Sequence, residues 1–153
     1  MSSEKNKVET GFKKILVATD FSDYADHAIE YAEVLAKQFE SEILLLHVIE
    51  SFTYSLTDSM TVIGHDQALS ATAEALLENL KSGLLGKGFS VESLLTHGTA
   101  YKEIVEQAKG AASDLIVVGT HGRTGMEHLL LGGVAEKVVR LAACPVLTVP
   151  GKK

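Results

Sequence analysis

The chain has 153 residues, of which 46% are hydrophobic and 22% are charged, with only two prolines. This composition is typical of a globular protein, and the length fits a single domain over residues 1–153 that buries about two-thirds of its unfolded surface. The formal net charge of −6 argues against a non-specific nucleic-acid binder, which needs a basic surface. It leaves an anionic small-molecule ligand open, because local backbone dipoles dominate at such a site.

The first ten residues are polar and charged, without the apolar stretch of a signal peptide. No apolar run elsewhere approaches the length that spans a bilayer. We therefore expect a cytoplasmic protein with no membrane segment, in which residues 1–11 form a flexible tail. Cys144 is the only cysteine, which excludes an internal disulfide.

Strands and helices are predicted to alternate along the chain. The aliphatic run within residues 13–20 indicates a strand buried on both faces, and Ser22 or Asp23 can cap the amphipathic helix that continues to Phe39. Further strands are expected at Glu42–Ile49, Ser90–Thr96, Asp114–Gly119 and Pro145–Val149, and further helices near His65–Leu85, Tyr101–Lys109 and Gly133–Ala142. This order predicts an open α/β fold, with a mostly parallel five-stranded sheet and helices on both faces.

One connection is longer than the others. Residues 51–64 carry scattered apolar side chains without a clear period. Connections of this length are either functional flaps or mobile segments, and the sequence leaves both readings open.

Ligands of such sheets bind outside the carboxyl ends of the strands, where the strand order reverses. The first turn there, residues 18–22, contains no glycine, so the dinucleotide-binding fingerprint is absent. The phosphate-loop motif and the nucleophile-elbow motif are absent as well. Dinucleotide-dependent dehydrogenases, P-loop NTPases and α/β hydrolases are therefore excluded.

The loop after the fourth strand is rich in glycine. Gly119 and Gly122 let the backbone approach a ligand closely, and Gly132 and Gly133 stand where the last helix begins. The unpaired N–H groups and the dipole of that helix form an anion site, to which Arg123 and His121 add positive charge. The alternative is that these glycines serve only a tight turn and a flexible loop.

Asp20 follows the first strand as Gly119 ends the fourth. If these strands are neighbours, the carboxylate of Asp20 faces the same crevice and can accept hydrogen bonds from ribose hydroxyls. The alternative role is an acidic residue near a helix N-terminus, worth about 0.3–1 kcal/mol.

Several of these segments resemble the universal stress protein family over about residues 12–150. The resemblance rests on residues 15–22, 45–48, 119–122 and 144–150, which read ILVATDFS, LLHV, GTHG and CPVLTVP. ATP-binding members carry the pattern G-x2-G-x9-G-[ST]. Gly119, Gly122 and Gly132 match this spacing, while Gly133 stands in place of the final serine or threonine.

The resemblance implies a sheet with the strand order 3-2-1-4-5 and an ATP site, with AMP or ADP as alternatives. Mg²⁺ or Mn²⁺ would be held mainly through the nucleotide phosphates. It also implies a homodimer formed through Val146–Val149. The residues predicted to bind the nucleotide are Ala18, Thr19, Asp20, Val48, Val118, Gly119, Gly122, Arg123, Gly132, Gly133 and Val134.

The histidines show no paired metal-ligand spacing, and His47 on a buried strand is most simply a hydrogen-bonded core residue. Three functions remain open at this point. The leading one is a nucleotide-binding regulatory module, and the others are a slow ATPase or phosphotransferase and a nucleotide-free protective dimer. The sequence shows neither a Walker lysine nor a catalytic-base motif, which favours binding over catalysis.

Overall fold

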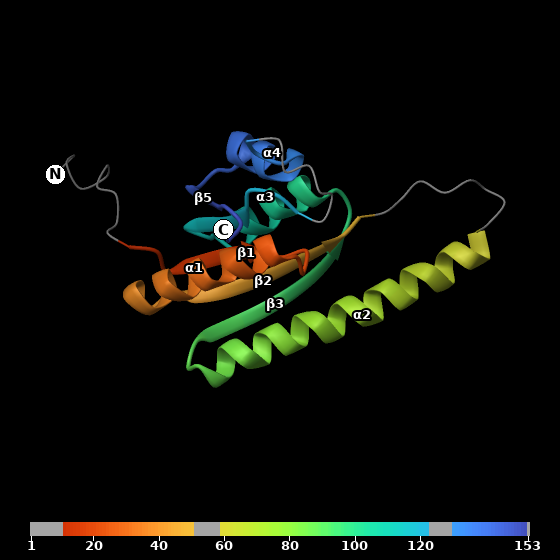
Figure 1. Cartoon of the computed structure of the whole chain (residues 1–153), viewed down its shortest axis with the longest axis horizontal. Helices are drawn as coiled ribbons and strands as arrows, with labels where there is room; N and C mark the ends of the chain where they lie inside the picture. Colours follow the sequence, from red (N-terminus) through yellow and green to blue (C-terminus); the bar gives the residue numbers. More distant parts are fainter. Residues whose placement is uncertain (1–10, 51–58, 123–129, 153) are drawn as a thin grey trace.

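Five strands build the sheet within the part of the chain that the computed structural model describes, residues 11–50, 59–122 and 130–152. They are β1 (Lys14–Ala18), β2 (Glu42–Ile49), β3 (Ser90–His97), β4 (Leu115–Gly119) and β5 (Val146–Val149). All neighbouring pairs are parallel, in the order β3-β2-β1-β4-β5 (Figure 1). The predicted fold and strand order are confirmed.

The strand β1 lies between β2 and β4. Val17 is in register with Leu45 on one side and with Val117 on the other. The strand order reverses at this point, because the chain moves outward from β1 to β3 and then returns to place β4 on the other side of β1. The carboxyl ends of β1 and β4 are therefore adjacent.

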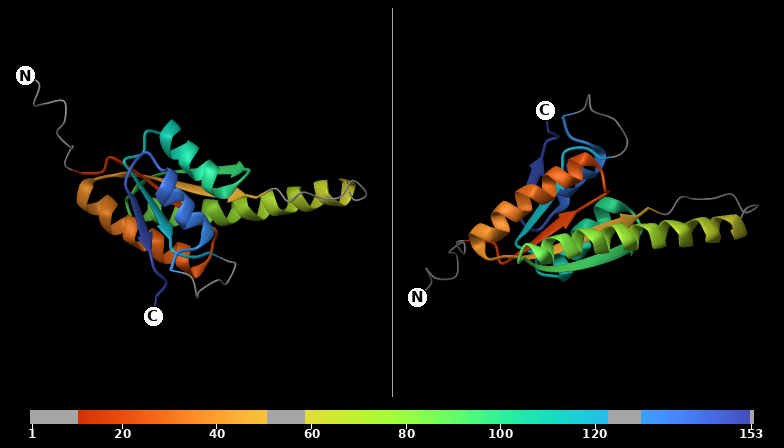
Figure 2. Two further views of the ribbon diagram at one scale, coloured as in Figure 1. Left: turned by 90° about the horizontal axis from the view of Figure 1, so that it is seen from above. Right: turned by 60° about the horizontal axis from the view of Figure 1, so that its bottom comes forward.

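Helices cover both faces of the sheet, as the alternation of elements predicted. They are α1 (Asp23–Phe39), α2 (Ser59–Gly86), α3 (Ala100–Gly110) and α4 (Gly133–Leu141). The first two pack on one face and the last two on the other (Figure 2). The beginning of α2 extends beyond the sheet (Figure 1).

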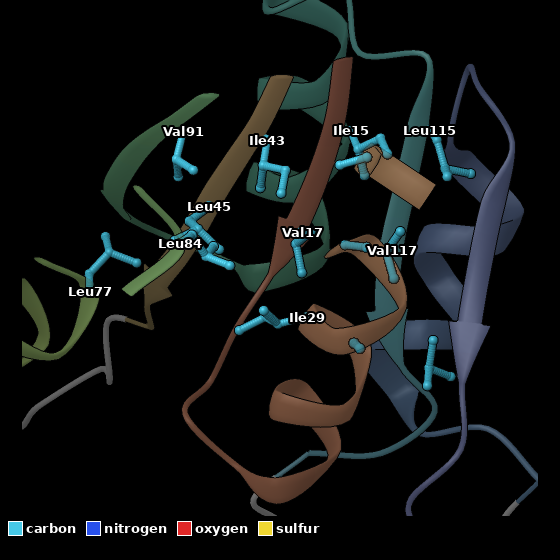
Figure 3. Packing of buried hydrophobic residues seen from close by; sticks show 14 residues of the cluster. Ile15, Val17, Ile29, Ile43, Leu45, Leu77, Leu84, Val91, Leu115 and Val117 are labelled. Atoms are coloured by element: carbon cyan, nitrogen blue, oxygen red, sulfur yellow. The ribbon is translucent and has the colours of Figure 1, made fainter. Parts of the chain in front are cut away.

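Each face of the sheet has its own apolar core. Ile15 and Val17 point toward α1 and α2, and Figure 3 shows this cluster with Leu77 of α2 beside it. Leu16, between them in the chain, points the other way and packs with α3 and α4. These three side chains are fully buried, and each contributes about 1.5–3 kcal/mol by leaving water. A strand buried on both faces explains the unbroken aliphatic run.

The start of α1 is set by Ser22. Its Oγ accepts a hydrogen bond from the backbone N–H of Ala25 at 3.2 Å, so Ser22 is the N-cap and Asp23 is the first residue of the helix. The helix ends at Phe39, and the left-handed φ of 55° at its C-cap Glu40 stops it before β2. The cap at Ser22 therefore sets where α1 begins after β1, and Glu40 sets where it ends.

The long connection predicted at residues 51–64 is corrected in part. The helix α2 begins at Ser59 and not near His65, so residues 59–64 are helical. Residues 51–58 lie outside the described residues, as do residues 1–10 of the predicted tail. None of the helices built from described residues combines the length and the hydropathy that a bilayer crossing requires.

Candidate functional site

A cavity of about 530 Å³ lies outside the carboxyl ends of β1, β2 and β4. This is the place where open α/β sheets bind ligands. Ten predicted site residues lie on its wall: Ala18, Thr19, Asp20, Val48, Val118, Gly119, Gly122, Gly132, Gly133 and Val134. Arg123 lies outside the described residues. The structure thus brings the predicted set together, and its role in nucleotide binding stays a prediction.

The turn from β1 to α1, residues 18–22, is held by its own side chains. Thr19 Oγ1 accepts a hydrogen bond from the N–H of Phe21 at 3.0 Å, and Asp20 Oδ1 accepts one from the N–H of Ser22 at 3.0 Å. Phe21 has a φ of 64°, in the left-handed region that residues other than glycine rarely adopt. These local bonds stabilise that conformation and direct the Asp20 side chain to the cavity.

The turn from β4 to α4 is held by backbone bonds. The N–H of Thr120 donates to the carbonyl of Val149 at 2.8 Å, and the N–H of Gly132 donates to the carbonyl of Thr120 at 2.6 Å. Gly119 is confined here, because a Cβ at that position would lie 3.0 Å from Cβ of Tyr24. The backbone therefore enters and leaves this loop at fixed positions.

The beginning of α4 has no side-chain cap. Its N-cap is Gly132, which offers no side-chain acceptor, and the described residues supply no other side-chain cap for the first-turn N–H groups. Gly133 and Val134 line the cavity, and a Cβ at Gly133 would meet nothing within 4 Å. The helix thus presents bare amides and the positive end of its dipole to an open space.

The two turns touch each other at Asp20 and Gly122. A Cβ at Gly122 would overlap Oδ2 of the Asp20 carboxylate. Any side chain at position 122 would displace this carboxylate or the loop. Glycine at this place therefore allows the close approach between the two turns without moving the Asp20 side chain.

His47 is a cavity residue that the sequence interpretation placed in the core. Its half-buried ring lies on the wall, and its Nδ1–H donates to the carbonyl of Thr19 at 2.7 Å. The ring also packs against Phe21, with centroids 4.5 Å apart. The hydrogen-bonded state was predicted, but the position on the cavity wall was not, because it depends on the register between β1 and β2.

The charges around the start of α1 are mainly acidic. Burial raises the pKa of the Asp26 carboxyl, and repulsion from Asp23, Asp20 and Glu30 raises it further, while Lys152 opposes the rise. An additional negative group is therefore disfavoured at this turn. The start of α4 is the side of the cavity where a negative group is stabilised.

Within residues 11–50, 59–122 and 130–152, no group of three or more His, Cys, Asp or Glu side chains could hold a metal ion. His97 shares a hydrogen bond with Ser70, with Nε2 and Oγ 3.2 Å apart, and His121 shares one with its neighbour Thr120. Burial and the nearby Asp114 raise the pKa of the Cys144 thiol, which keeps it protonated and unreactive.

An open parallel sheet with such a cavity where the strand order reverses is the arrangement in which α/β proteins commonly bind ligands. The model of the universal stress protein family matches residues 11–150, and the chain belongs to this family.

Relatives and solved structures agree with this assignment. Universal stress protein YxiE of Bacillus subtilis is 37% identical over 146 residues, covering 90% of this chain and 99% of the relative. The structure of hypothetical protein MJ0577 of Methanocaldococcus jannaschii has a TM-score of 0.81 at 32% identity, covering 92% and 97% of the two chains. A universal stress protein family protein of Arabidopsis thaliana, At3g01520, with AMP bound, has a TM-score of 0.67 at 27% identity, covering 92% of each chain.

Proposed function

We propose that this chain is an adenine-nucleotide-binding regulatory protein of the stress response, active as a cytoplasmic homodimer. ATP is the proposed ligand, with AMP and ADP as alternatives. The observation that carries the proposal is the junction of the two turns in one cavity. There the carboxylate of Asp20 and the bare amides at the start of α4 line the same space.

Each region of the cavity wall has the chemical character to bind one part of the proposed nucleotide. Ala18, Val48 and Val118 give an apolar surface suited to the adenine ring. Asp20 accepts hydrogen bonds from the ribose hydroxyls. The phosphates lie at the start of α4, where the amides of Gly133 and Val134 can donate to them. The volume of about 530 Å³ is within the range of small-molecule sites.

The charge distribution favours this orientation over the reverse one. Phosphates at the β1–α1 turn would face the Asp20 carboxylate, and the nearby Asp23 and Asp26 add negative charge to this side of the molecule. At α4 they would meet a helix dipole and first-turn amides that have no side-chain cap among the described residues. The AMP bound to At3g01520, 27% identical to this chain, supports the same class of ligand.

A divalent cation enters the proposal only through the phosphates. Mg²⁺ keeps several waters and is commonly held by nucleotide phosphates with few protein ligands. The described residues offer it no ready-made group of ligands, which fits this mode. When bound, the ion would neutralise phosphate charge, and the residues at the start of α4 would still orient the nucleotide.

Dimerisation is proposed through Val146–Val149. The strand β5 is an edge of the sheet and pairs with β4 among the described strands. Its other side offers backbone groups that a second copy can pair with, and edge strands need such cover. Sedimentation equilibrium should give twice the mass of the chain, whereas a monomer at micromolar concentration would contradict the proposal.

Isothermal titration with AMP and ATP tests the proposed ligand. We expect saturable binding of one nucleotide per chain, and weaker binding of GMP because the apolar surface offers no partner for its extra polar groups. Nucleotide released from freshly purified, denatured protein, identified by mass spectrometry, gives an independent check. Absence of adenine nucleotide in both measurements would contradict the proposed function.

A further inference from the structure

The geometry points to a role for His47 beyond filling the core: we propose that it is the positioning residue that holds the β1–α1 turn and thereby aims the Asp20 carboxylate into the cavity. This inference rests on the proposed function for its consequence in nucleotide binding. Its structural part, the hold on the turn, can be measured without any nucleotide.

The first contact fixes the end of β1. Nδ1 of His47 lies 2.7 Å from the carbonyl oxygen of Thr19 and donates to it. The N–H of Thr19 donates in turn to the carbonyl of Leu46 at 2.8 Å. Thr19 is therefore bound from two sides by consecutive residues of β2, one through its backbone and one through its side chain. It is 5% exposed, so water competes little for these bonds.

The second contact supports an unfavourable backbone conformation. Phe21 has a φ of 64°, and its ring packs on the ring of His47 with centroids 4.5 Å apart and planes at 36°. Its N–H donates to Thr19 Oγ1 at 3.0 Å. His47 thus contacts the turn on both sides of Asp20, through the carbonyl of Thr19 and the ring of Phe21. A left-handed residue without such support returns readily to the extended or helical region.

The proposed effect of His47 is on the position of Asp20, whose carboxylate is restrained by two contacts. Its Oδ1 accepts the N–H of Ser22 at 3.0 Å, and its Oδ2 lies against Gly122. A rotation of the peptide on either side would withdraw the carboxylate from Gly122 and from the cavity. His47 lies on the α1 and α2 face of β2, while the predicted adenine contact Val48 lies on the other face. Its contacts with Thr19 and Phe21 link it to Asp20 through the turn.

Two variants separate the hydrogen bond from the volume of the side chain. His47→Leu keeps a bulky side chain on the cavity wall and removes the hydrogen-bond donor to Thr19. His47→Asn instead places an amide N–H near the position of Nδ1. His97→Leu is the matched control, because His97 is exposed at the end of β3 and does not line the cavity. Circular dichroism and thermal unfolding verify that each variant is folded.

The nucleotide-free measurement is amide hydrogen exchange by NMR at Phe21 and Ser22, the two donors inside the turn. In His47→Leu we expect both to exchange about three- to tenfold faster, the effect of losing one hydrogen bond. Amides at the centre of β2 should not change, and His47→Asn should return most of the protection. Unchanged exchange at both donors in His47→Leu would overturn the inference, whether or not the protein binds a nucleotide.

The binding measurement compares AMP with its 2′,3′-dideoxy analogue, which lacks the hydroxyls proposed to meet Asp20. In His47→Leu we expect AMP to bind about three- to tenfold more weakly while the analogue changes less than about twofold. Equal losses for both ligands would mean general damage and would overturn the positioning role. If the wild type binds neither ligand, the proposed function fails. The exchange data alone then decide whether His47 stabilises the β1–α1 turn.

Discussion

The two turns that meet at the cavity hold their backbones by different means. The β1–α1 turn has no glycine, and the side chains of Thr19, Asp20 and Ser22 accept the N–H groups within it. At the described ends of the β4–α4 turn, backbone bonds hold Thr120 and Gly132, and a side chain added at Gly122 would meet Asp20. The β1–α1 turn is therefore sensitive to substitutions that remove side-chain atoms, and the β4–α4 turn is sensitive to substitutions that add them.

This difference matches the proposed orientation of the nucleotide, with its ribose at one turn and its phosphates at the other. A turn held by side chains can present a carboxylate in a fixed position, which suits hydroxyl groups. The glycines at the start of α4 let its amides approach a ligand at close range, which suits phosphate oxygens. The predictions below disturb one turn at a time, beginning with the position where they touch.

The largest effect is expected from Gly122→Val. The added side chain would overlap Oδ2 of Asp20 and displace the carboxylate or the loop. We expect a loss of about 3 kcal/mol in AMP binding, roughly a hundredfold. Calorimetric titration measures it, with Gly110→Ala as the control, since a Cβ at Gly110 meets nothing within 4 Å. Wild-type affinity in Gly122→Val would show that the two turns are not in contact.

The next effect is expected from Asp20→Asn, which keeps the acceptor for Ser22 and removes the charge. The hydrogen bonds of a charged carboxylate to ribose are worth about 1.5–3 kcal/mol, so AMP should bind roughly ten- to a hundredfold more weakly. Asp23→Asn, exposed and outside the cavity, is the control. Equal affinity of the two variants for AMP would remove Asp20 from the site.

Ser22→Ala tests the dependence of the first turn on a single hydroxyl. It removes the acceptor for the N–H of Ala25 and should lower the free energy of unfolding by about 1 kcal/mol. Urea unfolding measures this, with Ser82→Ala on the exposed side of α2 for comparison. An unfolding free energy that matches the control would mean that the cap contributes nothing.

Gly133→Ser tests the second turn, at the start of α4. Space around this position is open, so the added hydroxyl needs no rearrangement and can donate to a phosphate. We expect ATP to bind more tightly by about 1 kcal/mol, roughly fivefold, with little change in AMP if the hydroxyl meets the outer phosphates. Titration of both nucleotides measures this, and weaker ATP binding would contradict the proposed placement of the phosphates.

The smallest effect concerns the acidic residues at the start of α1. Because the pKa of Asp26 is raised in the folded protein, ionising this carboxyl lowers stability at neutral pH. Asp26→Asn should therefore stabilise the protein there, by less than about 0.5 kcal/mol since solvent screens an exposed group. The gain should vanish below the ordinary carboxyl pKa of 3.8, where both side chains are neutral. Unfolding curves at the two pH values measure it, and an equal gain at both would exclude a charge effect.

Much of the fold could be predicted from the sequence because burial leaves a clear pattern there. The run at residues 13–20 reports a strand covered on both faces, and the order of elements leads to the parallel sheet. The start of α2 at Ser59 was missed. An apolar period arises where a helix packs on a core, and this end of α2 extends beyond the sheet (Figure 1).

The residues that line the cavity could be predicted where a residue type carries the signal. Glycines such as Gly122 and a carboxylate after a strand, Asp20, stand out in the sequence. The contact of His47 with the β1–α1 turn could not be predicted, because it joins His47 to Thr19, 28 positions apart, and depends on the register of two strands. The overlap between positions 20 and 122 likewise exists only in three dimensions.

An NMR titration of the labelled protein with AMP tests the account most directly, because it shows where the ligand meets the chain. We predict that the largest amide shifts fall on both turns together, at Asp20 and Ser22 on one side and at Gly122, Gly133 and Val134 on the other. Shifts confined to one turn, or located away from the carboxyl end of the sheet, would contradict the claim that the two turns form one nucleotide site.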